Sequence, residues 1–326
     1  MKAIVVSELG GPEKLEYRDH PDPSPGEDEV VVEIESAGVN FIDTYHRTGL
    51  YDVGLPFIPG LEGSGVVKEA GPAVTDLAVG DRVAWVSGMG SYAERVAIPA
   101  GRAIPVPDNI SAQTAAALLL QGLTAHYLAT DTYPLDSETT CLIHAGAGGV
   151  GLLLTQIARI KGARVITTVG TPDKAELSTA AGASDVILYR DVDFATETER
   201  LVGAHGVDVV YDGVGAATFM RGLDVLRPRG LLVSFGNASG PVPEISPLLL
   251  SKKVSLFVTR PTLADYLQTR DDLMRRVDQL FDWVTSGELE VRIGDDYDLA
   301  HAGEAHIALE ARKTTGKVLL HPPSAR

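Results

Sequence analysis

The chain has 326 residues, of which 44% are hydrophobic and 22% charged, and its formal net charge is −16. This length and composition are typical of a folded globular protein with ample core, and an acidic surface repels phosphate backbones, so nucleic acid is not expected as the main partner. With no apolar run near the ~18 residues of a membrane span, no signal peptide and a single cysteine, Cys141, we expect a cytoplasmic protein without disulfides or membrane contact.

Residues 1–110 are rich in Gly, Pro and β-branched residues, which predicts a β domain. The expected strands, each bounded by turn residues, are 2–9, 29–39, 63–71, 82–86 and 94–99. Between them, AGVNFIDTYHRTGLY (37–51) is interpreted as a polar and aromatic loop. Its Asn40, Asp43, Tyr45 and Tyr51 either line a ligand site or only fill the edge of the domain, and the residues alone leave both readings open.

From residue 111 the pattern changes to alternating helices and strands. Residues 111–131 predict one or two helices with Ser111 as the N-cap. After Pro261, a helical stretch is expected over 262–287 and a second helix near 299–312, followed by a strand at 317–321 that packs back on the first domain. Strands rich in Val, Ile and Leu predict a parallel sheet with helices on both faces, and they are expected at 139–145, 163–170, 184–189, 207–215, 230–236 and 254–259.

HAGAGGVGLLL (144–154) places Gly146, Gly148 and Gly151 between a strand and a helix. Such glycines permit a tight turn and a close backbone approach, and the helix N-terminus offers N–H groups to a pyrophosphate. Glycine-rich turns also arise for packing alone. The strand–turn–helix context nevertheless favours a dinucleotide site.

The next strand and turn, VITTVGTPDK (165–174), decide which dinucleotide is expected. NAD sites usually carry Asp or Glu at the strand tip, where this chain has Gly170 and Thr171. A carboxylate would repel a 2′-phosphate, whereas hydroxyl groups and the Lys174 cation would attract it. NADPH is therefore favoured, although Asp173 is a counterargument and Lys174 has the alternative of being a solvated surface residue.

Sequence signals for other chemistry are weak. No nucleophile elbow, zinc-protease helix or Walker loop occurs. His301 and His306 are five residues apart, which does not put them on one helix face, and His144 is interpreted as a core histidine. We therefore expect no metal site.

Several segments together resemble the medium-chain dehydrogenase/reductase superfamily over essentially the full length, and within it the zinc-free NADPH:quinone oxidoreductases that include zeta-crystallin. PGLEGSGVV (59–67) resembles the superfamily's Gly-His-Glu segment with Leu61 at a zinc-ligand position, and AGVNFID (37–43) has Asn40 in place of a cysteine ligand. Two ligand positions are therefore apolar or amide, which implies chemistry without zinc. The further matching segments are NFIDTYHRTGLY, QGLTAHYL, HAGAGGVG, GTPDK, ILYR, VYDGVG, FGNASG and VTRP.

This resemblance implies an α/β fold: a Rossmann doubly wound parallel sheet (121–261) plus a GroES-like β-barrel domain formed from both chain termini (1–120 and 262–326). It also implies a homodimer that pairs through VSLFVT (254–259). The implied activity is NADPH-dependent quinone reduction by metal-free hydride transfer in the cleft between the domains, with Tyr45, Tyr51 and Asn40 positioning the substrate. The residues implied to hold NADPH are Asn40, Phe41, Asp43, Tyr45, Thr124, Tyr127, Gly148, Gly149, Val150, Gly170, Thr171, Lys174, Tyr189, Val214, Phe235, Gly236, Asn237, Val258, Thr259 and Arg260.

Two other functions stay open at this point. A 2-alkenal or enoyl-thioester reductase would share the scaffold and differ in the lining of its substrate site. A non-enzymatic role, as a crystallin or an RNA-binding protein, is known among relatives, although the −16 charge disfavours RNA. The residues specify neither the physiological acceptor nor a proton donor.

Overall fold

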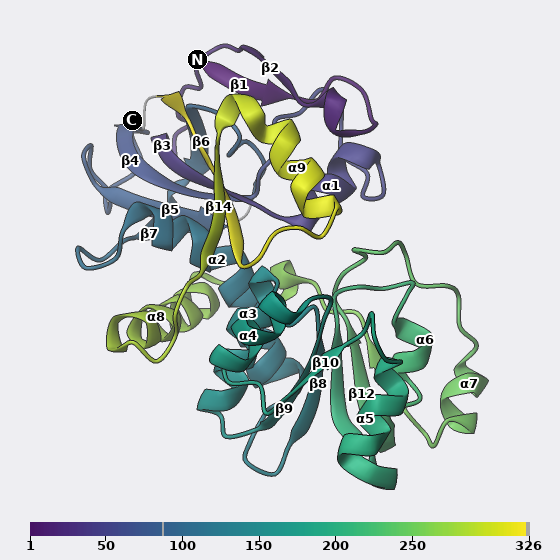
Figure 1. Ribbon diagram of the computed structural model, residues 1–326. Helices are drawn as coiled ribbons and strands as arrows, with labels where there is room; N and C mark the ends of the chain where they lie inside the picture. Colours follow the sequence, from purple (N-terminus) through teal and green to yellow (C-terminus); the bar gives the residue numbers. More distant parts are fainter. Residues whose placement is uncertain (87, 324–326) are drawn as a thin grey trace. The chain divides into compact units, whose positions relative to one another are not determined.

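Two units make up the structure, a computed structural model that describes residues 1–86 and 88–323 (Figure 1). One unit contains Met1–Gln121, Thr269–Thr285 and Val291–Arg326, and the other contains Gly122–Gln268 and Ser286–Glu290. Among the described residues, no helix is both long enough and apolar enough to cross a membrane.

The first unit is built on a seven-stranded sheet whose order is β14-β15-β3-β4-β5-β7, with β6 paired to β3. All of its pairs are antiparallel except that of β14 with β15. Its core includes the fully buried Ile34, Val83 and Trp85. The strands are β3 (Glu29–Val39), β4 (Glu62–Ala70), β5 (Arg82–Val86), β6 (Arg95–Pro99), β7 (Ile104–Pro105), β14 (Ile293–Asp298) and β15 (Lys317–His321).

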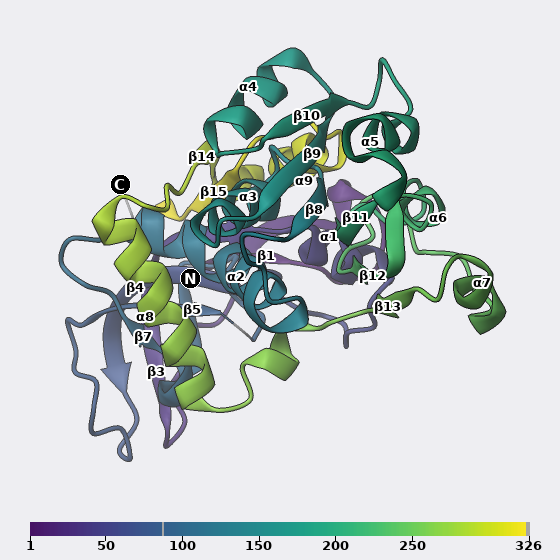
Figure 2. The ribbon, with the colours of Figure 1, turned by 90° about the horizontal axis from the view of Figure 1, so that it is seen from below.

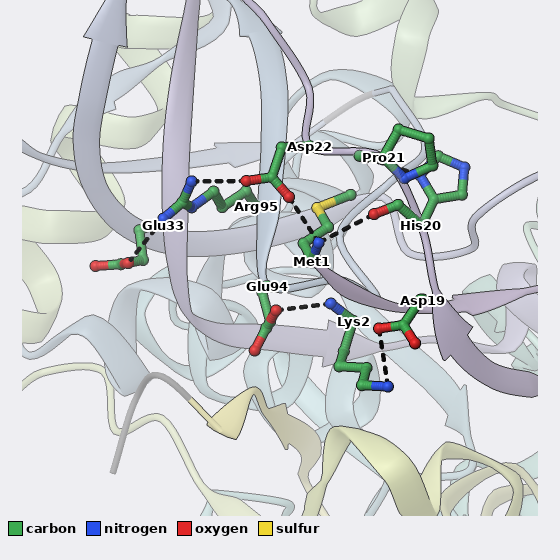
Figure 3. A network of polar contacts seen from close by, with 9 residues as sticks. All are labelled: Met1, Lys2, Asp19, His20, Pro21, Asp22, Glu33, Glu94 and Arg95. Atoms are coloured by element: carbon green, nitrogen blue, oxygen red, sulfur yellow. Dashed lines mark hydrogen bonds and ion pairs between the residues drawn. The ribbon is translucent and has the colours of Figure 1, made fainter.

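A hairpin of β1 (Lys2–Val5) and β2 (Glu16–Asp19) is attached to this sheet by polar contacts (Figure 3). The Met1 amino group donates to Asp22 at 2.6 Å, and the other oxygen of Asp22 accepts from Arg95 of β6 at 2.9 Å. The Lys2 N–H donates to Glu94 at 2.6 Å. The start of β1 and the segment that follows β2 are therefore tied to Glu94 and Arg95, where β6 begins.

Residues 41–48 form a helix, α1 (Phe41–Thr48), so the interpretation of 37–51 as a loop is wrong. The Asp43 carboxylate accepts a hydrogen bond from the Asn40 N–H at 2.8 Å, which caps the helix start. Gly49 ends the helix with φ of 79°, in the left-handed region that favours glycine. The helix was missed because it has only eight residues and polar residues interrupt its apolar ones.

Besides α1 and the first part of α2 (Ala112–Tyr127), the first unit contains α8 (Arg270–Ser286) and α9 (Ala302–Glu310). Figures 1 and 2 show α8 beside β7, where Arg270 donates to the carbonyl oxygens of Gly101 and Ala103 at 2.9 and 2.7 Å. Short 3₁₀ turns are η1 (Pro12–Lys14), η2 (Ala100–Arg102) and η6 (Leu299–His301).

The second unit has a six-stranded parallel sheet of order β10-β9-β8-β11-β12-β13. Numbered from β8, this is the order 3-2-1-4-5-6 of a Rossmann fold, so the predicted α/β fold is confirmed. Figure 1 shows α3 and α4 on one face of the sheet and α5 and α6 on the other. The strands are β8 (Thr140–His144), β9 (Arg164–Val169), β10 (Asp185–Leu188), β11 (Val207–Asp212), β12 (Leu226–Ser234) and β13 (Phe257–Thr259).

Ser111 precedes α2 (Ala112–Tyr127) and accepts from the Thr114 N–H at 3.0 Å, as its N-cap role predicts. One π-helical turn, η3 (Leu128–Thr132), follows. The helices that flank the sheet are α3 (Gly149–Ile160), α4 (Pro172–Ala180), α5 (Phe194–Val202), α6 (Phe219–Gly222) and α7 (Pro247–Lys252), with short 3₁₀ turns η4 (Gly203–His205) and η5 (Leu263–Tyr266).

Some predicted strands and helices differ from the observed ones. The strand expected at 254–259 begins only at Phe257, because Val254 and Ser255 have φ of 62° and 60°, which no strand accommodates. The helix expected over 262–287 divides into a 3₁₀ turn and α8. The sequence analysis also missed β14, whose acidic sequence IGDDYD lacks an apolar face.

Candidate functional site

In the second unit, most predicted cofactor residues follow directly after parallel strands. Gly148 follows β8, Gly170 follows β9, Val214 follows β11 and Phe235 follows β12. Because parallel strands end at the same edge of a sheet, these residues share the edge where nucleotides bind in Rossmann folds.

In the turn between β8 and α3, the surrounding atoms leave no room for a Cβ atom at two of the glycines. A Cβ atom on Gly151 would lie 2.2 Å from the Ala145 carbonyl oxygen, and one on Gly146 would lie 2.6 Å from Thr167. The first N–H groups of α3, at Gly149 and Val150, have no intrahelical acceptors, as at any helix N-terminus. This geometry fits a pyrophosphate against the backbone.

At the tip of β9, Gly170 and Thr171 stand where NAD sites carry an acid, and Asp173 lies in the first turn of α4. A Cβ atom on Gly170 would lie 2.8 Å from the Tyr189 hydroxyl oxygen and 3.3 Å from Nε of Arg190. Tyr189 and Arg190 are both exposed, and Lys174 lies half-buried in the first turn of α4. Thr171 caps this helix by accepting from the Lys174 N–H at 3.4 Å. The Tyr189 hydroxyl and Arg190, both suited to a phosphate, therefore lie beside Gly170, and Lys174 lies in the first turn of the helix that follows.

The ends of β11, β12 and β13 form a second group of predicted residues. Asp212 is fully buried, and it fixes the turn at Val214 by accepting from the Val214 N–H at 2.8 Å. Arg260 donates to the Gly236 carbonyl oxygen at 3.2 Å. Asn237 follows Gly236, and Val258 and Thr259 complete β13.

Two predicted cofactor residues on α2 are buried. Thr124 is 8% exposed and Tyr127 is 2% exposed. The Tyr127 ring stacks on Tyr266, with centroids 4.1 Å apart. Burial raises the pKa of Tyr127 above its usual range, so its hydroxyl stays protonated. The structure thus does not bring the Tyr127 ring to a solvent-facing position.

His144 is also buried, as its interpretation as a core histidine predicts. Its Nδ1 lies 2.9 Å from the Thr168 hydroxyl, and its ring packs edge-on against Phe194.

In the first unit, α1 groups the predicted aromatic residues. The Tyr45 and Tyr51 ring centroids are 5.3 Å apart and meet edge to face, and Phe41 lies 6.3 Å from Tyr45. Tyr45 is buried, whereas Phe41 and Tyr51 are only partly so. The structure thus brings these three predicted residues together.

Asp43 belongs to a buried chain of polar side chains rather than to a surface. Its Oδ2 also accepts from the Tyr92 hydroxyl at 3.0 Å, and Tyr92 lies 3.1 Å from Nε2 of His306. Arg47 is 2.9 Å from Nδ1 of His306 and pairs with Glu310 at 2.7 Å. Burial raises the pKa of Asp43 to about 7. A carboxyl group with no exposed surface holds α1 in place and does not face a ligand.

Asn40 is the centre of a second buried cluster. Its Nδ2 donates to Glu62 at 2.6 Å, and its Oδ1 accepts from the Lys317 ammonium at 2.9 Å and from Gln121 at 3.2 Å. Lys317 also forms an ion pair with Glu62, and the two side chains are 1% and 0% exposed. The second oxygen of Glu62 accepts from the Leu120 N–H at 2.7 Å.

The donor set of this cluster does not fit a zinc ion. Leu61 offers no ligand atom, and the Lys317 ammonium occupies the side of Asn40 where a cation would have to approach. Within residues 1–86 and 88–323, no three His, Cys, Asp or Glu side chains are grouped so that they could hold a metal ion. Cys141 is buried as well, and burial raises its pKa to about 12.

Sequence reasoning missed four residues of these sites: Glu62, Gln121, Lys317 and Arg190. Arg190 follows Tyr189 directly, so the same segment ILYR contained the signal. Lys317 and Glu62 are separated by 255 residues, and no local pattern links them.

Comparison with known proteins finds two family models that match the chain and relatives of similar length. Residues 26–108 match the alcohol dehydrogenase GroES-like domain, and residues 149–275 match the zinc-binding dehydrogenase family. A quinone oxidoreductase of Pseudomonas aeruginosa is 45% identical over 98% of this chain and 99% of its own length. A 2-haloacrylate reductase of Burkholderia is 38% identical over 98% of both chains.

The crystal structure of Escherichia coli quinone oxidoreductase complexed with NADPH superposes with a TM-score of 0.97 at 42% identity, over 99% of this chain and all of that one. These similarities cover both units of the chain. The chain therefore belongs to the quinone oxidoreductase family of the medium-chain dehydrogenase/reductase superfamily.

Proposed function

We propose that this protein reduces quinones with NADPH, by hydride transfer without a metal ion, in the cytoplasm. The observation that carries the proposal is the tip of β9, where a glycine flanked by Tyr189, Arg190 and Lys174 replaces the carboxylate of NAD sites. NADPH supplies the hydride, and the protein has to position it and keep water away. In this proposal 121–261 is the NADPH domain, and 1–120 with 262–326 is the substrate domain.

In this proposal, residues of the second unit bind NADPH and residues of the first unit position the electron acceptor. Lys174, Tyr189 and Arg190 bind the 2′-phosphate, and the backbone at Gly148, Gly149 and Val150 binds the pyrophosphate. Residues at the ends of β11, β12 and β13 contact the nicotinamide half. Asn40, Tyr45 and Tyr51 position the acceptor, while buried Asp43 holds α1.

A panel of acceptors tests the proposed activity. NADPH oxidation is measured with 1,4-benzoquinone and 9,10-phenanthrenequinone and compared with crotonaldehyde and crotonyl-CoA. We expect faster turnover of the quinones. Preference for crotonaldehyde or crotonyl-CoA would instead support an enoyl-type reductase, a candidate favoured by the 38% identity to a 2-haloacrylate reductase. NADPH binding without turnover of any acceptor would support a non-enzymatic role.

Lys174→Ala is expected to weaken NADPH binding by one to two powers of ten, about 1.5–3 kcal/mol for a charge-assisted contact. NADH binding should be nearly unchanged, because NADH lacks the 2′-phosphate. Titration calorimetry with both cofactors provides the measurement, with Arg190→Ala as a parallel variant and Lys252→Ala, an exposed lysine of α7, as the control. Equal losses for the two cofactors would remove Lys174 from the phosphate site.

We further propose a homodimer that pairs through β13, the strand at one edge of the six-stranded sheet. Phe257 in this strand is 59% exposed, which leaves an apolar side chain on an open sheet edge. Phe257→Glu is expected to give monomers in analytical ultracentrifugation. Ile307→Glu, at an equally exposed apolar residue of α9, is the control and should keep the dimer.

A further inference from the structure

The cluster around Asn40 fixes the direction of its hydrogen bonds. An ammonium group only donates hydrogen bonds and a carboxylate only accepts them. Asn40 therefore turns Oδ1 toward Lys317 and Nδ2 toward Glu62, as the distances of 2.9 and 2.6 Å require. The opposite amide orientation would place an N–H against the ammonium and an oxygen against the carboxylate.

The fixed orientation of Asn40 also fixes that of Gln121. An amide side chain can usually exchange its oxygen and nitrogen positions at little cost, so its orientation follows from its partners. Here the Gln121 partner is Oδ1 of Asn40, an acceptor, and Gln121 directs Nε2 at it over 3.2 Å. The buried ion pair thus determines, through Asn40, which way the Gln121 amide points.

Gln121 is the member of the cluster that a ligand can reach. Asn40, Glu62 and Lys317 are 4%, 0% and 1% exposed, whereas Gln121 is only partly buried. In the part of the chain that the structure describes, Gln121 forms its hydrogen bond with Asn40 alone, which leaves one N–H and Oε1 for a ligand. Gln121 also adjoins Asn40, a residue that the proposed function assigns to positioning the electron acceptor.

We propose that Gln121 donates a hydrogen bond from its second N–H to the carbonyl oxygen of the electron acceptor, and that Lys317, Glu62 and Asn40 are positioning residues that hold this donor. The inference rests on the proposed function. When NADPH gives its hydride to the acceptor and becomes NADP⁺, negative charge develops on the acceptor oxygen, which then takes a proton from water. A fixed N–H donor stabilises that charge, and Gln121 keeps its own protons.

Steady-state kinetics of Gln121→Leu in the full-length protein tests the inference. We expect kcat/KM for 1,4-benzoquinone to fall about 10- to 100-fold, because one donor to a developing charge is lost. The NADPH dissociation constant and the unfolding midpoint should stay unchanged, since Gln121 is placed at the acceptor. Gln121→Glu, which keeps the shape but carries no N–H, should lose as much. Gln113→Leu removes an exposed glutamine from the same helix and should behave like the unsubstituted protein.

Two results would overturn the inference while leaving the proposed function intact. One is a Gln121→Leu variant with the quinone kinetics of Gln113→Leu, and the other is a loss confined to NADPH binding. Failure of the unsubstituted protein to reduce any carbonyl acceptor would instead reject the proposed function, and this inference with it. A loss shared by Gln121→Leu and Gln121→Glu, with NADPH binding intact, supports it.

Discussion

Glu62→Gln is expected to lower the free energy of unfolding by about 3–5 kcal/mol, the usual cost of leaving a buried charge without its partner. Lys317 is 1% exposed and has the Glu62 carboxylate as its counter-charge. Glutamine keeps the size of the side chain and can still accept from the Leu120 N–H. Its amide nitrogen then replaces the oxygen that accepts from Asn40 and Lys317, so the loss includes these hydrogen bonds as well as the charge. Urea denaturation near neutral pH, followed by circular dichroism, measures it.

The matched control for Glu62→Gln is Glu33→Gln. Glu33 pairs with Lys68 at 2.6 Å, but both side chains are partly exposed, at 28% and 41%. Removal of such a surface pair is expected to cost below about 1 kcal/mol. The double variant Glu62→Gln with Lys317→Met should recover more than half of the loss, because it removes the uncompensated charge. If Glu62→Gln and Glu33→Gln lowered the free energy of unfolding equally, the Glu62–Lys317 pair would not be a buried, energetically coupled one.

Asp43→Asn is expected to abolish a pH-dependent contribution of about 4 kcal/mol to stability. Burial raises the pKa of Asp43 to about 7, whereas an unfolded aspartate has a pKa of about 3.9. Between these values the native carboxyl group holds a proton that the unfolded one has lost. The contribution of Asp43 is therefore full below about pH 4 and is lost as the pH rises to about 7. Asparagine is neutral at every pH and imitates the protonated form.

The contribution of His306 to stability changes with pH in the opposite direction to that of Asp43. The test must therefore compare the unsubstituted protein with Asp43→Asn. Burial, with a smaller effect of Arg47, lowers the pKa of His306 to about 3, from about 6.5 when unfolded. Between these values the unfolded chain binds the extra proton, so the His306 contribution to stability rises with pH. In the unsubstituted protein the two contributions partly cancel. In Asp43→Asn the rise from His306 should appear without the opposing contribution of Asp43, and together with the rises from His46 and His144, because burial lowers the pKa of these histidines too.

Unfolding free energies measured from pH 4 to pH 8 test this prediction. Relative to Asp43→Asn, the unsubstituted protein should lose stability steadily up to about pH 7 and then level off. Asp108→Asn, at an exposed aspartate of the same unit, should give a curve parallel to that of the unsubstituted protein. Parallel curves for Asp43→Asn as well would mean that Asp43 is ionised throughout this range.

The second unit could be predicted well from the sequence because its signals are local. Buried strands such as β8 and β9 alternate with helices, and the glycine turn lies between β8 and α3. Each of these patterns lies within a short stretch of chain. The order of the six strands then follows from the family resemblance.

The first unit could be predicted less well because its site depends on distant pairs. A lysine in the strand KVLLH at 317–321 is as compatible with a solvated position as with a buried one. Only the fold places it against Glu62, 255 residues away. The same holds for Tyr92 and His306, which are 214 residues apart. Hydrophobic periodicity does not reveal a buried polar contact, because both partners interrupt the apolar pattern.

The position of β15 between β14 and β3 affects the order in which the two units fold during synthesis. Asn40 and Lys317 are 277 residues apart, and nearly all of the second unit, 122–268, is made between them. The ribosome therefore releases the second unit while the first still lacks a central strand and the counter-charge of Glu62. Contacts of such sequence separation form late and slowly. The Asn40 cluster, which we propose to lie at the acceptor, thus forms only after the unit proposed to bind the cofactor has been synthesised.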